Sequence, residues 1–453
     1  MNNDYVGTGA DIDFDARRKA AIKAVAIGNF VEWYDFVLYG LFSTTLAAVF
    51  FPKSSATAGL LATFAILGVS FLARPLGGLL FGQIGDRLGR KQALLISVLV
   101  MSGATVVVGL LPGAAQIGIL APLLLLVCRL AQAVAAGGEY GPSTSYIVEF
   151  APPDKRGRFA SIVPAWNYIG CFAGVLVSLT VTLSVTPEDL LSWGWRIPFL
   201  IAAPLGLVGL YLRMRMEESP VFEALRETGT VEKTPLREAL RSSKKPLLII
   251  IGWAMTNATA AYIMSTYLVS HMSAKASFGV ANAFVVQLVL WTVLTVGTLV
   301  AGRLIDRVGR KTVAVTCATA MTIIAVPAVA LLENSSLTQS IVIVFVVAVF
   351  YAGFTATTAL AMVELLPPAI RATGAAISFQ IAYAVFGGTA PILATWWVSM
   401  GWSLAPGMYL AGLSAVSTVV AALWIGNRAG STEQDEDPVR PHVEPCESVD
   451  PVM

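Results

Sequence analysis

A short polar turn that occurs twice limits the possible folds of this chain more than any other feature. GQIGDRLGRK (82–91) returns as GRLIDRVGRK (302–311), 220 residues later. The pattern E-x-x-P-P-x-x-R, which begins at Glu149, returns at Glu364, 215 residues later. One repeated turn can arise by chance, but two in the same order indicate an internal duplication. This is the arrangement of secondary transporters that are built from two parallel halves.

The apolar runs between these turns predict a membrane protein. The chain has 56% hydrophobic and 13% charged residues, whereas about 25% of the residues of a soluble domain are charged. The runs are about 20 residues long, which favours helices over the ~10-residue strands of a barrel. We therefore expect an all-α polytopic fold with twelve spans. They are 21–45, 58–81, 92–112, 117–147, 159–184, 195–216, 246–270, 280–303, 312–332, 338–362, 373–398 and 405–426.

The distribution of charge predicts the topology. Most Lys and Arg residues, Arg213 among them, fall on the side that the N-terminus shares. The positive-inside rule then places both termini in the cytoplasm. The polar tail is acidic and rich in Pro, so we expect it to be disordered. The predicted divisions are a cytoplasmic N-terminal segment (1–20), a six-helix half (21–216), a cytoplasmic linker (217–245), a second six-helix half (246–426) and the cytoplasmic tail (427–453).

Composition also argues against several classes of site. Four scattered cysteines give no disulfide framework or metal site. Two histidines, His271 near the outer rim and His442 in the tail, leave no catalytic base beside a nucleophile. We therefore expect no enzyme activity, no cofactor, no metal and no nucleic-acid partner. The expected partners are a small solute, H⁺ and the lipid bilayer, and we expect the protein to function as a monomer.

The two turns and the 6+6 layout resemble the major facilitator superfamily over almost the whole chain. Further strings resemble its metabolite:H⁺ symporter family: GNFVEWYDFVLYG (28–40), ARPLGG (73–78), CRLAQ followed by GGEYG (128–141), and WGWRIPF (193–199). YLRMRMEESPVF (211–222), followed after the linker by ATAAYIMSTYL (258–268), is most similar to the proline/betaine transporters. The resemblance implies a symporter of the cytoplasmic (inner) membrane that works by alternating access. Osmosensing members carry a C-terminal coiled coil, but 429–453 has no apolar heptad.

The first span carries a pair of carboxylates suited to proton transfer. Glu32 and Asp35 lie three residues apart, hence on one helix face, near the middle of the bilayer. A charge there costs about 2.5–3.5 kcal/mol on insertion scales, so the side chains should face the bundle interior. On the fourth span Arg129 and Glu139 share a face, and we expect an ion pair between spans one and four. These four residues form the predicted proton-coupling set; a purely structural ion pair is the alternative.

The predicted solute site combines one arginine with neutral groups of the second half. Deep cations are confined to Arg74 and Arg129, and pairing of Arg74 with Glu139 or with Asp35 is left open. Aromatic faces attract the ammonium group of a zwitterion, although aromatic residues of membrane helices more often serve packing. The predicted substrate-binding residues are Arg74, Trp253, Asn257, Gln287, Trp291, Gln380 and Tyr383.

The repeated turns predict a conformational gate. Charges at the ends of spans two and eight can hold two helices together in one state and release them in another; charges that only fix topology are the alternative. We expect Asp86 to act with Arg90, and Asp306 with Arg310. The predicted gating residues are Gly82, Asp86, Arg87, Gly89, Arg90, Glu149, Arg156, Asp306, Arg307, Arg310, Glu364 and Arg371.

The leading hypothesis is a proton-coupled importer of a small zwitterionic osmolyte of the proline/glycine betaine type. One alternative is a proton symporter of a carboxylate metabolite, such as a dicarboxylate, citrate or a shikimate-like acid. A second is a proton-coupled drug exporter with the same fold.

Overall fold

The computed structural model describes residues 9–52, 54, 56–229, 235–273 and 279–426, and the regular elements in these ranges are all helices. Eleven helices are long and apolar enough to cross a membrane, or twelve when the bent pair at the start counts as one span. The predicted all-α polytopic fold is confirmed. The prediction of a disordered tail concerns residues outside the described ranges.

The first half contains one bent span and several interrupted ones. The first span extends to Phe50 through a 65° bend after Leu41, whereas the sequence predicted a single run that ends at residue 45. The predicted fourth span, 117–147, is divided between two helices. The elements are α1 (Gly9–Leu41), α2 (Ser43–Phe50), α3 (Ala56–Arg87), α4 (Arg90–Leu110), α5 (Ala114–Ile117), α6 (Leu120–Gly137), α7 (Tyr140–Glu149), η1 (Pro153–Lys155), α8 (Arg156–Ala160), α9 (Ile162–Ser184), α10 (Pro187–Asp189), η2 (Leu190–Gly194) and α11 (Arg196–Met214).

The linker carries two short helices, α12 (Pro220–Glu227) and α13 (Pro235–Ser242). Two spans of the second half contain π-helical segments, η3 and η5, which are frequent at functional sites. The remaining elements are α14 (Lys244–Tyr262), η3 (Ile263–Tyr267), α15 (Leu268–Ser273), α16 (Gly279–Val308), α17 (Arg310–Leu332), α18 (Leu337–Glu364), η4 (Pro368–Ile370), α19 (Arg371–Ala382), η5 (Tyr383–Gly387), α20 (Ala390–Ser399) and α21 (Ala405–Trp424).

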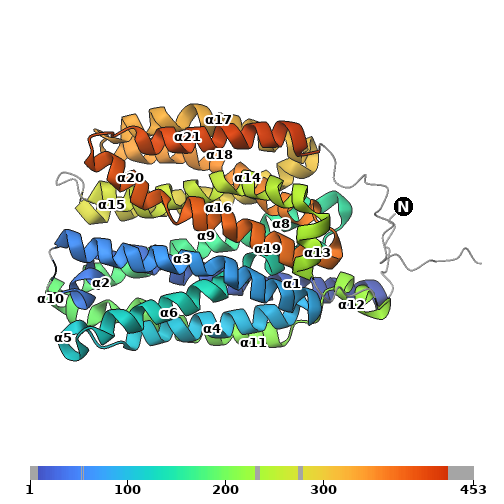
Figure 1. Ribbon diagram of the computed structural model, residues 1–453, viewed down its shortest axis with the longest axis horizontal. Coiled ribbons are helices and arrows are strands. Elements are labelled where there is room, and N and C mark those ends of the chain that lie inside the picture. Colours follow the sequence, from blue (N-terminus) through green and yellow to red (C-terminus); the bar gives the residue numbers. More distant parts are fainter. Residues whose placement is uncertain (1–8, 53, 55, 230–234, 274–278, 427–453) are drawn as a thin grey trace, which may run out of the picture.

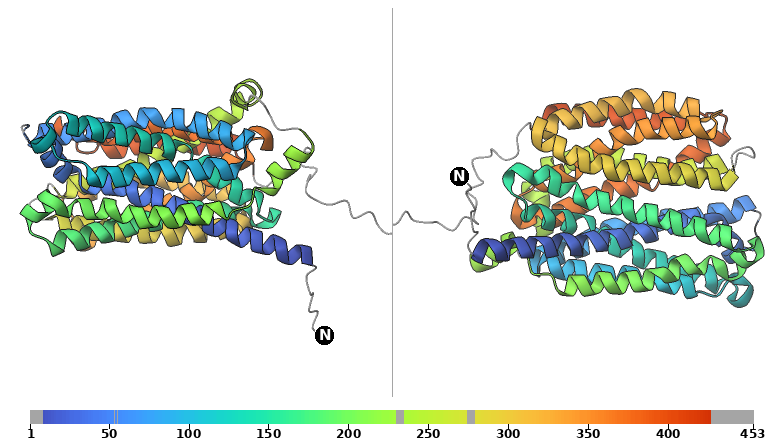
Figure 2. Two further views of the ribbon diagram at one scale, coloured as in Figure 1. Left: turned by 90° about the horizontal axis from the view of Figure 1, so that it is seen from below. Right: turned by 180° about the vertical axis from the view of Figure 1, so that it is seen from behind.

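The long helices run side by side, and the two halves form two adjacent blocks (Figure 1). Helix α3 packs on α19, and α16 packs on α8 and α9, so each half contacts the other through corresponding helices. The start of α1 and the helices α12 and α13 lie at one end of the bundle, and α5 and α10 lie at the other, as the further views also show (Figure 2). We call the first of these the linker end.

Helix α3 shows how the bundle sorts its residues. Leu72, Leu76 and Leu80, spaced four residues apart, are 69%, 58% and 53% exposed and form an apolar stripe on the outside of the bundle. Arg74 on the same helix is buried, and Gly77 lies against the backbone of Val134 on α6. Apolar residues thus face the bilayer, and small or polar residues face other helices, as expected where lipid is the solvent.

Candidate functional site

The predicted ion pair between the first and fourth spans is present. Arg129 Nη1 lies 3.7 Å from Asp35 Oδ2, and both side chains are buried. Gln132 fixes the pair, since its amide donates to Asp35 Oδ1 at 3.0 Å and accepts from Arg129 Nη1 at 2.8 Å. The guanidinium also lies over the ring of Tyr39, 4.3 Å from its centroid. Asp35 is therefore held by a guanidinium and an amide.

A second buried ion pair was not predicted. Arg213 was assigned to the basic side that sets topology, but its side chain is fully buried and pairs with Glu139. Arg213 Nη1 also donates to the carbonyl of Leu94 at 2.5 Å, and Ser97 Oγ donates to Glu139 Oε2 at 2.5 Å. A Cβ at Gly28 would lie 1.6 Å from Arg213 Nη2, so the glycine provides the space for the guanidinium.

Arg74 forms neither of the two ion pairs that the sequence left open. No carboxylate of the described residues lies within 4 Å of it, because Asp35 is paired with Arg129 and Glu139 with Arg213. Its guanidinium instead lies 4.7 Å from the ring centroid of Phe71 and 5.6 Å from that of Phe36. The expectation that deep cations are confined to Arg74 and Arg129 was also wrong, since Arg213 is fully buried.

Glu32 is the remaining deep carboxylate of the first half. It is 6% exposed and forms no ion pair or hydrogen bond with a described residue. It lines a cavity of about 10 Å³, together with Ser97 and Glu139, which is space for about one water molecule. A charged carboxylate in such a place is unfavourable. Glu32 thus differs from Asp35 and Glu139, which each have an arginine partner.

Aromatic rings connect Arg74 to the second half. Phe36 and Phe71, which flank the guanidinium, both meet Tyr262 of α14 edge to face, with centroids 5.3 and 4.8 Å apart. Tyr262 in turn meets Tyr383 of η5 at 6.1 Å. Arg74 therefore lies beside a group of rings that spans the boundary between the halves.

Three of the predicted solute-site residues belong to one network. Asn257 Nδ2 donates to Tyr383 Oη at 2.9 Å, and Asn257 Oδ1 accepts from Thr355 Oγ1 at 2.8 Å. Thr355 also accepts from Tyr168 of α9 at 3.0 Å, and Tyr168 stacks on Trp291 with centroids 5.7 Å apart. Asn257, Trp291 and Tyr383 are thus brought together, and Tyr168 joins them to the first half.

Gln287 and Gln380 form their hydrogen bonds outside this network. Gln380 crosses the boundary, where its amide donates to the carbonyl of Ala136 at 3.3 Å. Gln287 donates to the carbonyl of Met264 at 2.7 Å and lines a cavity of about 20 Å³ between α1 and η3.

Trp253 is separate from the other predicted solute-site residues. Its ring stacks on Phe354 with centroids 4.1 Å apart, inside an apolar cluster with Ala301 and Ile305. The sequence included Trp253 as one of the aromatic residues of the second half that could receive an ammonium group, but its ring is enclosed in this apolar cluster. We therefore assign Trp253 to packing.

Several buried polar side-chain atoms on helices that meet at the boundary between the halves have no hydrogen-bond partner in the structure. In the described part of the chain they include Glu32 Oε2, Tyr140 Oη, Tyr262 Oη, Trp291 Nε1 and Gln380 Oε1. Buried polar atoms are normally satisfied, so such a group calls for an explanation. A polar solute would supply the missing partners. We define the central site as Glu32, Arg74, Tyr140, Tyr262, Trp291, Gln380 and Tyr383.

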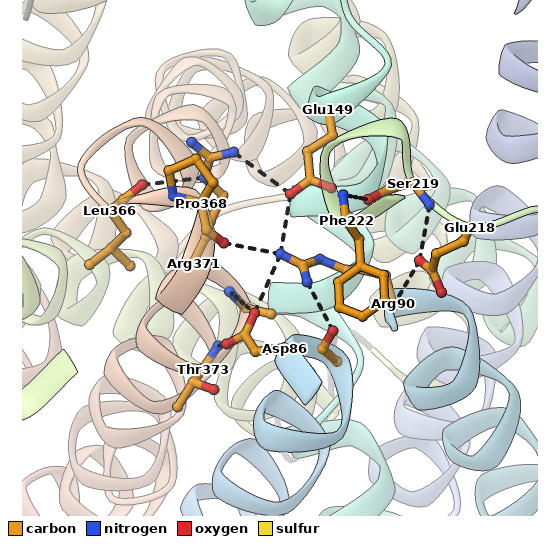
Figure 3. A network of polar contacts seen from close by, with 12 residues as sticks. Asp86, Arg90, Glu149, Glu218, Ser219, Phe222, Leu366, Pro368, Arg371 and Thr373 are labelled. Atoms are coloured by element: carbon orange, nitrogen blue, oxygen red, sulfur yellow. Dashed lines mark hydrogen bonds and ion pairs between the residues drawn. The ribbon is translucent and has the colours of Figure 1, made fainter. Parts of the chain in front are cut away.

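Figure 3 shows the first charged cluster, at the linker end, which we define as Asp86, Arg90, Glu149 and Arg371. Asp86 accepts from the backbone N–H of Thr373 at 2.8 Å, in the first turn of α19 in the other half. Arg90 lies 3.4 Å from Asp86 and 3.6 Å from Glu149, which lies 3.7 Å from Arg371. A carboxylate at a helix N-terminus satisfies free amides and the helix dipole, so Asp86 joins the halves.

The linker adds residues to this cluster that the sequence did not reveal. Glu218 accepts from the backbone N–H of Arg90 at 2.9 Å, and the Phe222 ring lies 5.2 Å from Arg90 Cζ (Figure 3). Burial raises the pKa of Glu218 above its ordinary value, despite these hydrogen bonds and Arg90. Gly89 permits the approach, since its φ is +111° and a Cβ would lie 2.0 Å from Glu218 Oε2. The sequence did offer one sign of a helix here, because Ser219 is a favourable N-cap and Pro220 a favourable first residue of α12.

The second charged cluster comprises Asp306, Arg158, Arg310 and Glu364, and here the predicted pairing was wrong. Asp306 accepts from the backbone N–H of Gly157 at 2.7 Å and of Arg158 at 3.1 Å, in the first turn of α8. Its ion-pair partner is Arg158 at 3.5 Å, whereas Arg310 pairs with Glu364. The physical reason is that Asp306, in the last turn of α16, lies next to the free backbone amides at the start of α8.

The other predicted gating residues have different surroundings. Arg87 and Arg307 are exposed and form no ion pair with a residue in the described ranges. Arg156 lines, with Arg307 and Arg310, a cavity of about 380 Å³. Gly82 lies where α3 meets α19, and a Cβ there would be 2.8 Å from Thr373 Cα. Close approach of the two halves therefore depends on this glycine.

Comparison with known proteins gives the family. The sequence model of the family described as sugar (and other) transporter matches the chain twice, over residues 21–234 and 221–432. The chain belongs to this family of the major facilitator superfamily. It is thus a multi-span membrane transporter of small solutes rather than an enzyme.

The relatives of this transporter include named osmolyte carriers. It is 35% identical over 417 residues to the ectoine/proline transporter ProP of Corynebacterium glutamicum, covering 88% of this chain and 82% of that protein. It is 34% identical over 415 residues to the proline/betaine transporter of Escherichia coli K12, covering 89% and 83%. Among solved structures, the proton:xylose symporter XylE bound to 6-bromo-6-deoxy-D-glucose has a TM-score of 0.77 at 17% identity, covering 91% and 97%. The last similarity concerns the fold.

Proposed function

We propose that this transporter imports a small zwitterionic osmolyte of the proline/glycine betaine type together with protons. The observation that carries the proposal is the central site. There the guanidinium of Arg74, which has no carboxylate partner among the described residues, lies beside aromatic rings and polar atoms that these residues leave without a hydrogen bond. The relatives named as transporters of proline, betaine and ectoine support it.

The chemistry of the site suits a zwitterion. Arg74 can form charge-assisted hydrogen bonds with a carboxylate, and the faces of Tyr262, Trp291 and Tyr383 can receive an ammonium group. Arg129 and Arg213 already have carboxylate partners. Within the described ranges, a solute with two or three negative charges would therefore find only the guanidinium of Arg74 without a carboxylate partner to receive them.

The proposed proton carriers are Glu32 and Asp35. Both are buried on one face of α1, and Glu139 and Arg129 lie near them on the fourth span. Proton binding to a buried carboxylate removes the cost of a charge in a low-dielectric interior. The proton occupancy of Glu32 and Asp35 can therefore be linked to the side of the membrane to which the central site is open.

Alternating access would use the two charged clusters as gates at the linker end. We propose that this end is cytoplasmic, that both termini lie there, and that the protein functions as a monomer in the cytoplasmic membrane. Both clusters join an aspartate of one half to helix amides of the other, which supports their opening and closing together.

A competition assay tests the substrate class. Cells that express the protein take up radiolabelled proline at fixed pH in the presence of millimolar glycine betaine, citrate or 2-oxoglutarate. We expect glycine betaine to inhibit uptake strongly and the two acids to have little effect. Inhibition by the acids alone would reject the zwitterion and favour the carboxylate symporter. Trp253→Phe is a control that should keep the wild-type pattern, because Trp253 packs outside the central site.

A further inference from the structure

We propose that Glu32 and the carboxylate of the solute compete for Arg74, so that this arginine links proton binding to solute binding. The inference rests on the proposed proton-coupled import and specifies how the two ligands communicate.

The first step is the pairing of charges inside the first half. Away from the charged clusters, the described part of this half buries three carboxylates and three guanidinium groups. Two pairs are closed, Asp35 with Arg129 and Glu139 with Arg213. Each pair has further hydrogen bonds, from Gln132 and from Ser97 respectively. Glu32 and Arg74 remain, one of each sign, and neither has an ion-pair partner.

The second step is their proximity. Glu32 and Phe36 lie one helical turn apart on α1 and share a face. The guanidinium of Arg74 lies over Phe36 and Phe71. Arg74 therefore lies beside the face of α1 that carries Glu32, and its charge acts on that carboxylate. Both belong to the central site, where the solute is proposed to bind.

The third step concerns the other groups around Glu32. Besides Arg74, six other charged or titratable groups interact electrostatically with Glu32. They are Asp35, Glu139, Arg213, Tyr140, Cys171 and Tyr262. Arg213 pairs with Glu139, whose negative charge acts on Glu32 more strongly than that of Asp35. With Glu139 and Asp35 both paired, neither competes with Glu32 for Arg74. Arg213 is thus a positioning residue, because it acts through Glu139.

Glu32 and the solute carboxylate can therefore exchange places as partners of Arg74. When Glu32 holds its proton it is neutral, and Arg74 is free to bind the solute carboxylate. When Glu32 loses the proton to the water on the open side, its carboxylate attracts Arg74, since opposite charges interact strongly in a low-dielectric interior. The solute carboxylate then loses its partner, so proton release and solute release occur together.

Equilibrium binding of radiolabelled glycine betaine to the purified full-length protein between pH 5.5 and 8.5 tests this exchange. The unmodified protein should lose affinity as the pH rises, by up to about tenfold per pH unit where one proton is linked to one solute. Glu32→Gln, which mimics the protonated state, should bind with an affinity that does not change with pH. Glu188→Gln, a control at an exposed carboxylate of α10, should retain the wild-type dependence.

A second variant guards against loss of folding in the first. Arg74→Gln should bind glycine betaine at least tenfold more weakly at pH 5.5, and the residual binding should not depend on pH. Wild-type pH dependence in folded Glu32→Gln or Arg74→Gln would overturn the inference and leave the proposed function standing. Failure of the unmodified protein to bind any zwitterion at any pH would instead overturn the proposed function.

Discussion

At the scale of single residues, the interior of the first half is organised by which charges are paired. Arg213 is the clearest case, because the sequence placed it in a basic set and the structure buries it against Glu139. Gly28 makes this possible, since a larger residue would occupy the position of the guanidinium.

A double-mutant cycle tests the Glu139–Arg213 pair. Glu139→Gln and Arg213→Gln should each destabilise the protein by about 3–5 kcal/mol, because each leaves one buried charge without its partner. The double variant should lose less than the sum, since no lone charge remains. Thermal unfolding in detergent measures the three losses. Additive losses would contradict a direct interaction between the two side chains.

Glu218 predicts a pH effect on stability. Its pKa is raised by burial, so between the ordinary glutamate pKa of about 4.3 and the raised value the folded state binds more protons than the unfolded state. Stability therefore falls as the pH rises through this window. Between pH 4 and pH 8, the Tm of Glu218→Gln should therefore rise relative to the Tm of the unmodified protein. A constant difference would show that Glu218 has the same pKa in both states.

The ion pairs show what residue spacing can predict. Asp35 and Arg129 could be paired from sequence because both lie near the middle of a span and at similar depth. Arg213 lies in the last turn of α11, where a long basic side chain usually extends to water, so depth alone gave the wrong result. Asp306 was paired with Arg310 by analogy with the first turn, whereas its partners, Gly157 and Arg158, lie 148 and more residues away.

At the scale of helices, two corresponding contacts join the two halves at the linker end. Asp86 at the end of α3 binds the amides of α19, and Asp306 at the end of α16 binds those of α8. The repeated turns therefore place equivalent carboxylates at equivalent helix starts in the opposite half. The first contact is more buried, since the side chains of Asp86 and its ion-pair partner Arg90 are fully buried, whereas those of Asp306 and Arg158 are 9% and 43% exposed.

Removal of the first contact should open the linker end. In a protein whose other cysteines are replaced, Thr373→Cys reports exposure of the first turn of α19. Asp86→Ala should increase its labelling by a thiol reagent several-fold, because the free amides can then be solvated by water. Asp306→Ala should give a smaller increase. Arg87→Gln, an exposed neighbour, is the control and should leave labelling unchanged. Equal labelling of Thr373→Cys with and without Asp86 would contradict a gating role.

At the scale of the whole molecule, the helical fold could be predicted because a bilayer leaves the backbone few alternatives. The division into two halves could also be predicted, because the turn at 82–91 is repeated at 302–311. The 65° bend after Leu41 and the π segments η3 and η5 could not be predicted, since such breaks depend on packing between distant helices. Packing between helices also decides that Trp253 stacks on Phe354, whereas Asn257, one turn further along the same face of α14, bonds Tyr383 and Thr355.

The central claim is that solute and protons cross the membrane together through the central site. The most direct measurement is the change of pH outside proteoliposomes, with no gradient imposed, when glycine betaine or proline is added. We expect the external solution to become more alkaline as protons enter with the solute, and we expect no such change for Glu32→Gln, although it should still exchange labelled for unlabelled solute. Uptake of the solute by the unmodified protein without any proton movement would contradict the account.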